Sequence, residues 1–183
     1  QYFLVKAGMS FYTFRVAEGA KGGSKSSPTK VTAYKMFTID TRNALFASSN
    51  SAYGTIDNLE TWINQGFGYT SDQKAIYVPV FNGKDDNAIL VYDVAKYVTA
   101  AKLDANKNCG SNEILYPSTL NFRIKKSSKL FEIESCGFRT GQGTNGDLYL
   151  YFNTNSSSSA TEGIFRIKYK RTASLPAPAV NAS

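Results

Sequence analysis

Apolar residues follow short strand-like patterns along most of the chain, and Gly, Asn and Ser separate these stretches. Apolar and polar positions alternate within many of the stretches, which predicts β-strands with one buried face. Helical periodicity is scarce, and short helices are expected only around residues 94–102 and from residue 57 onward. The pattern therefore predicts an all-β fold built from antiparallel sheets.

Three segments share one order of elements: a strand, a polar turn and a second strand. They begin at residues 2, 76 and 148, which gives offsets of 74 (2 to 76) and 72 (76 to 148). A recurring period is the sequence signature of a repeat architecture. We therefore expect about three repeat units.

Additional strands extend these units into larger sheets. A Gly-Phe strand precedes the second unit at residues 65–69 and the third at residues 135–139, whereas the first unit lacks it. Further strands are expected at residues 35–39 with 44–47, and at residues 120–125. Each unit is thus predicted to form a sheet of three or four consecutive antiparallel strands.

The second and third units resemble the blades of secreted bacterial β-propeller proteins. The resemblance rests on Gln65-Gly-Phe…Ile76-Tyr-Val-Pro…Ile89-Leu-Val-Tyr-Asp and on Glu134-Ser-Cys-Gly-Phe…Leu148-Tyr-Leu-Tyr-Phe-Asn…Gly163-Ile-Phe-Arg-Ile. It implies four-stranded blades around a channel. Three units do not close a ring, so the chain is expected to be the C-terminal part of a propeller completed by further blades or a partner chain. The alternative is an open β-sandwich.

The predicted organisation is a single all-β domain over residues 1–171 with two flexible segments. Residues 18–30 are rich in Gly, Lys and Ser and are expected to form a flexible loop. Residues 172–183, which contain two prolines, are expected to form a flexible tail.

Composition narrows the chemistry. The 183 residues include no histidine, which excludes Ser-His-Asp catalysis and histidine-based zinc sites. No stretch of eighteen apolar residues is present, so no membrane span is expected. The net charge of +7 favours anionic partners or serves solubility. Abundant Tyr, Asn, Ser and Gly are typical of a secreted or cell-surface β protein.

Two cysteines, Cys109 and Cys136, form either one disulfide or two free thiols. Cys109 lies in a polar stretch, where a reduced thiol would be exposed and reactive. We predict a disulfide between them, with the free thiols as the alternative.

A candidate ligand site is carried by residues of the two Gly-Phe strands. Glu132 and Glu134 lie two positions apart, so they share one face of a regular strand. Asn64 and Gln65 are the matching polar residues of the second unit, and Trp62 is the best candidate for stacking on a sugar ring. Together they predict a site for a sugar or a cation; the alternative is a surface ladder of charged residues.

Two further groups of residues offer binding chemistry. Asp85, Asp86 and Asn87 offer oxygen ligands for calcium, although turns favour the same residues, and no other cofactor is expected. Cationic residues alternate with apolar ones in two strands, which predicts either a polyanion-binding stripe or a solvated sheet face. These residues are Arg123, Lys125, Arg166, Lys168 and Lys170. Nucleic acid is a poor fit, since most aromatic residues fall on the opposite face.

The sequence favours an extracellular binding module that recognises a glycan, a cell-wall polymer or a protein. One alternative is a carboxylate-based glycoside hydrolase or lyase that uses Glu132, Glu134 and Tyr149. Another is a structural protein of a surface or matrix. The sequence leaves open whether the protein is an enzyme, although the absence of histidine favours binding.

Overall fold

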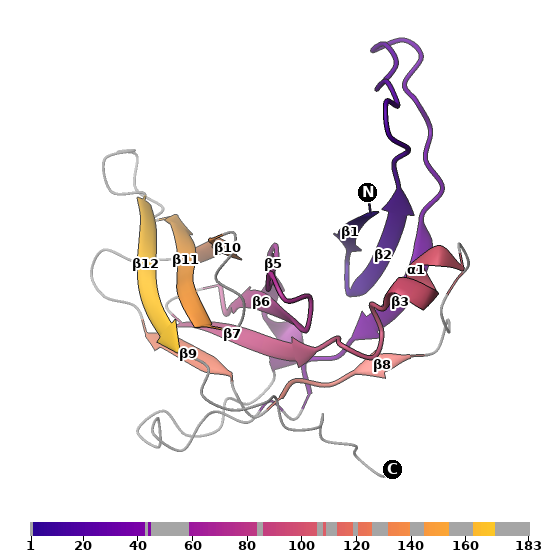
Figure 1. The fold of residues 1–183 in the computed structure, drawn as a ribbon. Helices are drawn as coiled ribbons and strands as arrows, with labels where there is room; N and C mark the ends of the chain where they lie inside the picture. Colours follow the sequence, from indigo (N-terminus) through magenta and orange to yellow (C-terminus); the bar gives the residue numbers. More distant parts are fainter. Residues whose placement is uncertain are drawn as a thin grey trace. The chain divides into compact units, whose positions relative to one another are not determined.

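The computed structural model describes residues 2–42, 44, 59–83, 86–105, 108, 113–118, 121–125, 132–139, 145–153 and 163–170 (Figure 1). Strands joined in antiparallel sheets make up most of these residues, so the all-β prediction is confirmed. Within the described residues, no helix reaches the length and apolar character that a membrane crossing requires.

The chain divides into two compact units. Unit 1 consists of Gln1–Ile39 and Lys96–Ile114, and unit 2 of Asp40–Ala95 and Leu115–Ser183. The expectation of a single domain over residues 1–171 stays a prediction. The tail at residues 172–183 and the strand expected at 45–47 lie outside the described residues.

Unit 1 is built on a meander of three strands. The order in its sheet is β1 (Tyr2–Ala7), β2 (Ser10–Arg15), β3 (Tyr34–Ile39) and the short β8 (Ile114–Leu115). Phe11 and Phe37 stack at 4.9 Å between ring centroids in its core, and Tyr97 meets Phe37 edge-on at 6.1 Å. The returning segment therefore packs on the sheet through an aromatic contact.

A short helix, α1 (Ala100–Asp104), follows Tyr97 in unit 1. Its N-cap is Thr99, whose side-chain oxygen accepts a hydrogen bond from the Lys102 amide at 3.3 Å. Asp104 at its C-terminal end accepts a hydrogen bond of 2.6 Å from the Tyr2 hydroxyl. The helix expected at residues 94–102 thus forms, but later and shorter, because its N-cap is at residue 99.

The segment between β2 and β3, expected to be a flexible loop at residues 18–30, contains a small hairpin. Ser24 and Ser27 exchange two backbone hydrogen bonds of 3.0 and 3.1 Å, and Thr29 donates to the Gly22 carbonyl at 3.0 Å. Gly23 lies at φ +76°, where a side chain would collide with the backbone of Ser27. Backbone pairing therefore organises a stretch whose composition predicts disorder.

Unit 2 contains two antiparallel sheets. The first has the order β4 (Ile63–Asn64), β6 (Ala75–Phe81), β7 (Asp86–Asp93) and β9 (Phe122–Lys125), and β5 (Gly68–Tyr69) also pairs with β6. The second has the order β10 (Glu132–Phe138), β11 (Asn145–Asn153) and β12 (Gly163–Lys170). The two predicted hairpins and the strand predicted at residues 120–125 are confirmed. A short 3₁₀ turn, η2 (Leu59–Thr61), precedes β4, near the helix expected from residue 57.

The hairpin of β6 and β7 is the buried centre of unit 2. Fourteen of its fifteen strand residues are buried, and Asp93 at the end of β7 is half-buried. One face of the hairpin packs against the sheet of β10, β11 and β12. The shared core contains Ala75, Tyr77, Ile89, Val91, Ile133, Cys136, Leu148, Leu150 and Phe152. Each large apolar side chain buried there contributes about 1.5–3 kcal/mol.

Buried asparagines satisfy backbone groups where the strand ladders end. The Oδ1 atom of Asn87 accepts a hydrogen bond of 2.9 Å from the Ile133 amide and so joins the two sheets. The Oδ1 atom of Asn121 accepts one of 2.9 Å from the Val91 amide, and the backbone amide of Ser118 donates to the Val91 carbonyl at 2.7 Å. The two asparagine side chains thus supply partners that buried backbone groups require.

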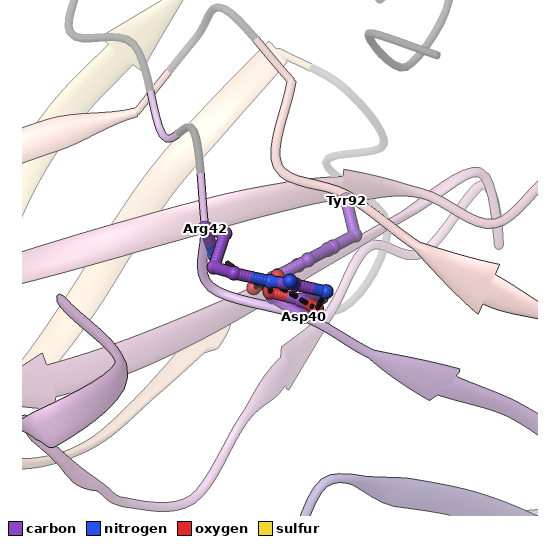
Figure 2. Close-up of polar contacts among 3 residues, drawn as sticks. All are labelled: Asp40, Arg42 and Tyr92. Carbon is purple, nitrogen blue, oxygen red and sulfur yellow. Dashed lines mark hydrogen bonds and ion pairs between the residues drawn. The ribbon is translucent and has the colours of Figure 1, made fainter. Parts of the chain in front are cut away.

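The opposite face of the hairpin carries a tyrosine clamp (Figure 2). Tyr92 is fully buried, and its hydroxyl donates to the Asp40 carbonyl at 2.8 Å. Burial raises the pKa of the Tyr92 hydroxyl well above its ordinary value. The Asp40 carboxylate in turn pairs with the Arg42 guanidinium at 2.6 Å, which lowers the pKa of Asp40. Because Arg42 is mostly exposed, this ion pair contributes little stability, and the buried hydroxyl is the stronger anchor.

The contact between β5 and β10 gives a test of the packing in unit 2. A methyl group on Gly68 would lie 3.0 Å from the Cys136 carbonyl oxygen and 3.2 Å from its Sγ atom, whereas one on Gly66 would meet nothing closer than 3.6 Å. We expect Gly68→Ala to lower the free energy of unfolding by about 1–3 kcal/mol. The matched Gly66→Ala should change it by less than about 0.5 kcal/mol. Urea denaturation midpoints measure both, and equal midpoints would contradict the close approach.

Candidate functional site

The sheet of β10, β11 and β12 has one face in the core and one that faces away from it. Along β11, Leu148, Leu150 and Phe152 are buried, while the intervening residues are half-buried. Successive side chains of a strand point to opposite sides, so these intervening residues form a row on the other face. We call this the outer face; its row on β11 consists of Tyr149, Tyr151 and Asn153.

Small residues flank the two tyrosines on the β10 side. Gly137 lies opposite Tyr149, and Ser135 lies opposite Tyr151. A Cβ atom added at Gly137 would find no atom of the described residues within 4 Å, so among them the space beside Tyr149 is open. On the β12 side, the exposed Arg166 lies opposite Tyr149, and Ile164 is opposite Tyr151. The outer face thus combines two aromatic rings with open space beside them.

A β-bulge extends the row of β11 into a polar cluster. The register shifts between Ile133 and Ser135, which makes Glu134 the extra residue of β10. Asn153 lies opposite Glu132, and its Nδ2 atom donates to the Glu134 Oε1 atom at 3.2 Å. The bulge therefore brings both glutamates into reach of one asparagine.

A segment from the neighbouring sheet completes the cluster. The side-chain Nε2 atom of Gln65 donates to the Glu132 Oε1 atom at 2.5 Å. The backbone amide of Gln65 donates to the Pro79 carbonyl at 3.1 Å. Gly66 donates from its amide to the Glu134 carbonyl at 3.4 Å. Gln65, Glu132, Glu134 and Asn153 form what we call the carboxylate–amide cluster. The sequence predicted three of these residues for one site.

The carboxylate–amide cluster perturbs Glu132. Partial burial and the nearby Glu134 carboxylate raise the pKa of Glu132, and the hydrogen bond from Gln65 opposes that shift. In the folded protein, Glu132 therefore retains its proton to a higher pH than an exposed glutamate does. The folded protein binds this proton more tightly than the unfolded chain does. The resulting contribution to the free energy of unfolding is present below the ordinary pKa of a glutamate and is lost as the pH rises through the raised pKa.

The two other residues predicted for this site lie just before it in the chain. Asn64 is half-buried and ends β4 opposite Val80. Trp62 is half-buried, and its amide donates to the Leu59 carbonyl at 3.0 Å at the end of the 3₁₀ turn. The sugar-stacking role predicted for Trp62 stays a prediction.

The cationic residues predicted to form one stripe belong to two different sheets. Arg123 and Lys125 lie in β9, which pairs with β7, and the other three lie in β12, which pairs with β11. Lys125 is opposite Asp86 in the ladder, and Lys168 is opposite Asp147. Each strand thus has an acidic residue opposite one of its cations, and a continuous stripe stays a prediction.

The residues considered for calcium are engaged in the backbone of β7. Asn87 uses its side-chain oxygen to accept from Ile133, and Asp86 pairs with Asn82 through its amide at 3.0 Å. Asp85 lies outside the described residues. Across the described ranges, no three His, Cys, Asp or Glu residues gather as metal ligands. The calcium site stays a prediction.

The predicted disulfide is not shown. Cys136 is a free thiol buried in the core, where it donates to the Tyr77 carbonyl at 3.2 Å. Burial raises the pKa of this thiol to about 12, so it holds its proton at neutral pH. Cys109 lies outside the described residues. Alternation along β10 explains the burial, since Cys136 is opposite the core residue Leu150.

Asn153 and Tyr151 were not among the residues predicted for the site. The signal was present, because these residues continue the odd-numbered positions of β11 that include Tyr149. The link to the glutamates depends on the bulge at Glu134, for which strand alternation carries no signal.

The pKa of Glu132 tests the geometry of the cluster. Replacing Glu134 by Gln removes a neighbouring negative charge but keeps an oxygen that accepts from Asn153. We therefore expect Glu134→Gln to lower the pKa of Glu132, measured by the NMR chemical shift of its carboxyl carbon against pH. The matched Glu113→Gln, in unit 1, should leave that pKa unchanged. Equal titration curves for the wild type and Glu134→Gln would refute the proximity of the two carboxylates.

A scan of protein-family models, a search of curated protein sequences and a search of solved structures each find no match for this chain. The case for function therefore depends on the outer face and the carboxylate–amide cluster alone.

Proposed function

We propose that this protein is a glycan-binding module and that the outer face of the β10–β11–β12 sheet is its binding surface. The observation that carries the proposal is the row along β11, in which Tyr149 and Tyr151 lead into Asn153 and the carboxylate–amide cluster. Rings and hydrogen-bonding groups lie side by side on one face.

Sugars present two kinds of surface to a protein, and the outer face has a counterpart for each. The apolar C–H face of a sugar ring packs on an aromatic ring, and alternate residues of a strand lie about 6.4–6.8 Å apart, so the two tyrosines offer two adjacent platforms. Sugar hydroxyls both donate and accept. Carboxylate oxygens accept from them, and amide side chains do both. Open space beside Gly137 leaves room for a chain of sugars to lie across the sheet.

The carboxylates also favour a second, catalytic candidate. Glu132 has a raised pKa, as a general acid requires. Tyr149 lies on the outer face, and Glu134 accepts a hydrogen bond from Asn153 of the same row. A glycoside hydrolase uses a proton-donating carboxylic acid and a second carboxylate. Cleavage of the bound glycan at Glu132 is thus the alternative to binding alone.

An extracellular setting and a propeller-like arrangement belong to the same proposal. The two sheets of unit 2 pack face to face, and the sheet of β10, β11 and β12 follows the chain as an antiparallel meander. Neighbouring propeller blades have these two properties, and so do the halves of a β-sandwich. We favour blades because β10, β11 and β12 are consecutive in the chain. A cell-wall or matrix polysaccharide is then the expected ligand.

The proposal is tested with soluble hexasaccharides of β-1,4-linked glucose, xylose and N-acetylglucosamine, with affinity measured by calorimetry. We expect at least one to bind, and Tyr149→Ala to weaken it roughly two- to tenfold, because stacking on one ring is lost. Tyr149→Phe keeps the ring and should bind nearly as well as the wild type. Gly137→Val should fold normally and weaken binding by filling the open space beside Tyr149.

Product analysis separates the two candidate functions. Release of reducing ends from a bound hexasaccharide, abolished by Glu132→Gln, would establish the hydrolase. Binding without release would establish the binding module. Failure of every hexasaccharide to bind, or binding that Tyr149→Ala leaves intact, would refute the assignment of the outer face and favour a purely structural role.

A further inference from the structure

Strand β12 is a long edge strand with exposed apolar side chains. It spans eight residues, and within the described part of the chain its ladder partner is β11 alone. Ile164 is 72% exposed and Phe165 is 39% exposed. An edge strand presents a row of backbone N–H and C=O groups to any chain that comes alongside, and long apolar edges are the ones that pair.

The other edge of the same sheet is covered. There, Gly66 donates a hydrogen bond to the Glu134 carbonyl, and Gly68 lies close against the backbone of Cys136. A segment of this chain thus occupies the β10 edge, and the absence of a side chain at Gly68 permits its close approach. Nothing in the described residues pairs with β12 in the same way, so the two edges differ in exposure and in apolar character.

The sequence of β12 is cationic as well as apolar. Arg166, Lys168 and Lys170 occupy alternate positions of the strand, which contains no acidic residue. In the ladder, Asp147 is opposite Lys168, whereas Tyr149 is opposite Arg166 and Asn145 is opposite Lys170. The neighbouring strand therefore supplies one negative charge for three positive ones.

We propose that the β12 edge binds an extended segment of another protein, in which acidic and apolar residues alternate, as an added antiparallel strand. Backbone hydrogen bonds supply general affinity in this mode of recognition, and side chains opposite each other supply specificity. Acidic residues of the added strand complement positions 166, 168 and 170 on one face, and its apolar residues lie opposite positions 165, 167 and 169 on the other. A second copy of the chain fits poorly, since β12 paired with itself brings two cationic strands together.

The test uses the full chain and a labelled, end-capped octapeptide, Thr-Val-Glu-Val-Glu-Val-Glu-Thr. We expect saturable binding by fluorescence anisotropy, weakened by salt, and slower amide hydrogen exchange at residues 163–170. The same peptide with Lys in place of Glu should bind roughly tenfold more weakly or not at all. A version N-methylated at alternate residues on its pairing edge should also lose binding, because it cannot donate the ladder hydrogen bonds.

A protein variant gives a second control. Arg166→Glu should lower the affinity for the Glu peptide and raise the affinity for the Lys peptide. A general loss of folding does not produce this reversal. Equal binding of the N-methylated peptide, or binding without protection of residues 163–170, would overturn strand addition. Protection of these amides by self-association in the absence of peptide would assign the edge to a second copy and overturn the proposed partner. Failure of the Glu peptide to bind would also overturn it, whatever the outcome with hexasaccharides.

Discussion

Burial of the β6–β7 hairpin on both faces is the constraint on which the organisation of unit 2 depends. Strand β6 is apolar at every position, and so are residues 88–92 of β7, so neither face of the hairpin can be left in water and each needs a covering layer. The sheet of β10, β11 and β12 covers one face, and the Tyr92 hydroxyl bonded to the Asp40 carbonyl fastens another segment on the opposite side. Once the inner face of the covering sheet is committed to this core, strand alternation leaves its outer face for recognition.

Strand β10 contributes both to the core of unit 2 and to the candidate site. It lies between β11 and the Gln65–Gly68 segment, and it carries both a core thiol and two glutamates. The bulge allows one strand to keep Ile133 and Cys136 in the core while Glu134 reaches Asn153. A regular strand cannot satisfy both demands, because its side chains alternate strictly. The cluster is therefore a product of core packing and bulge together.

Features that depend on residues close together in the sequence could be predicted, whereas most of those that depend on contacts between distant segments could not. Apolar stretches and turn residues are local signals, so the hairpins at residues 76–94 and 148–169 were predictable. Gln65 and Glu132 were placed in one site because equivalent positions of two similar segments were compared. The hairpin around Gly23 was missed, since its composition is typical of a flexible loop and only backbone pairing distinguishes it. The buried state of Cys136 depends on register with β11, which composition does not encode.

The division of the chain into two units has a consequence for biosynthesis. Unit 1 is discontinuous: its first three strands end at Ile39, and its aromatic anchor, its helix and β8 follow only after Lys96. A ribosome adds about 5–20 residues per second, so β1, β2 and β3 wait for seconds before Tyr97 can pack on Phe37. During that interval, the β6–β7 hairpin is synthesised and has only local contacts to form. The order of translation thus lets the centre of unit 2 begin folding before unit 1 can be completed.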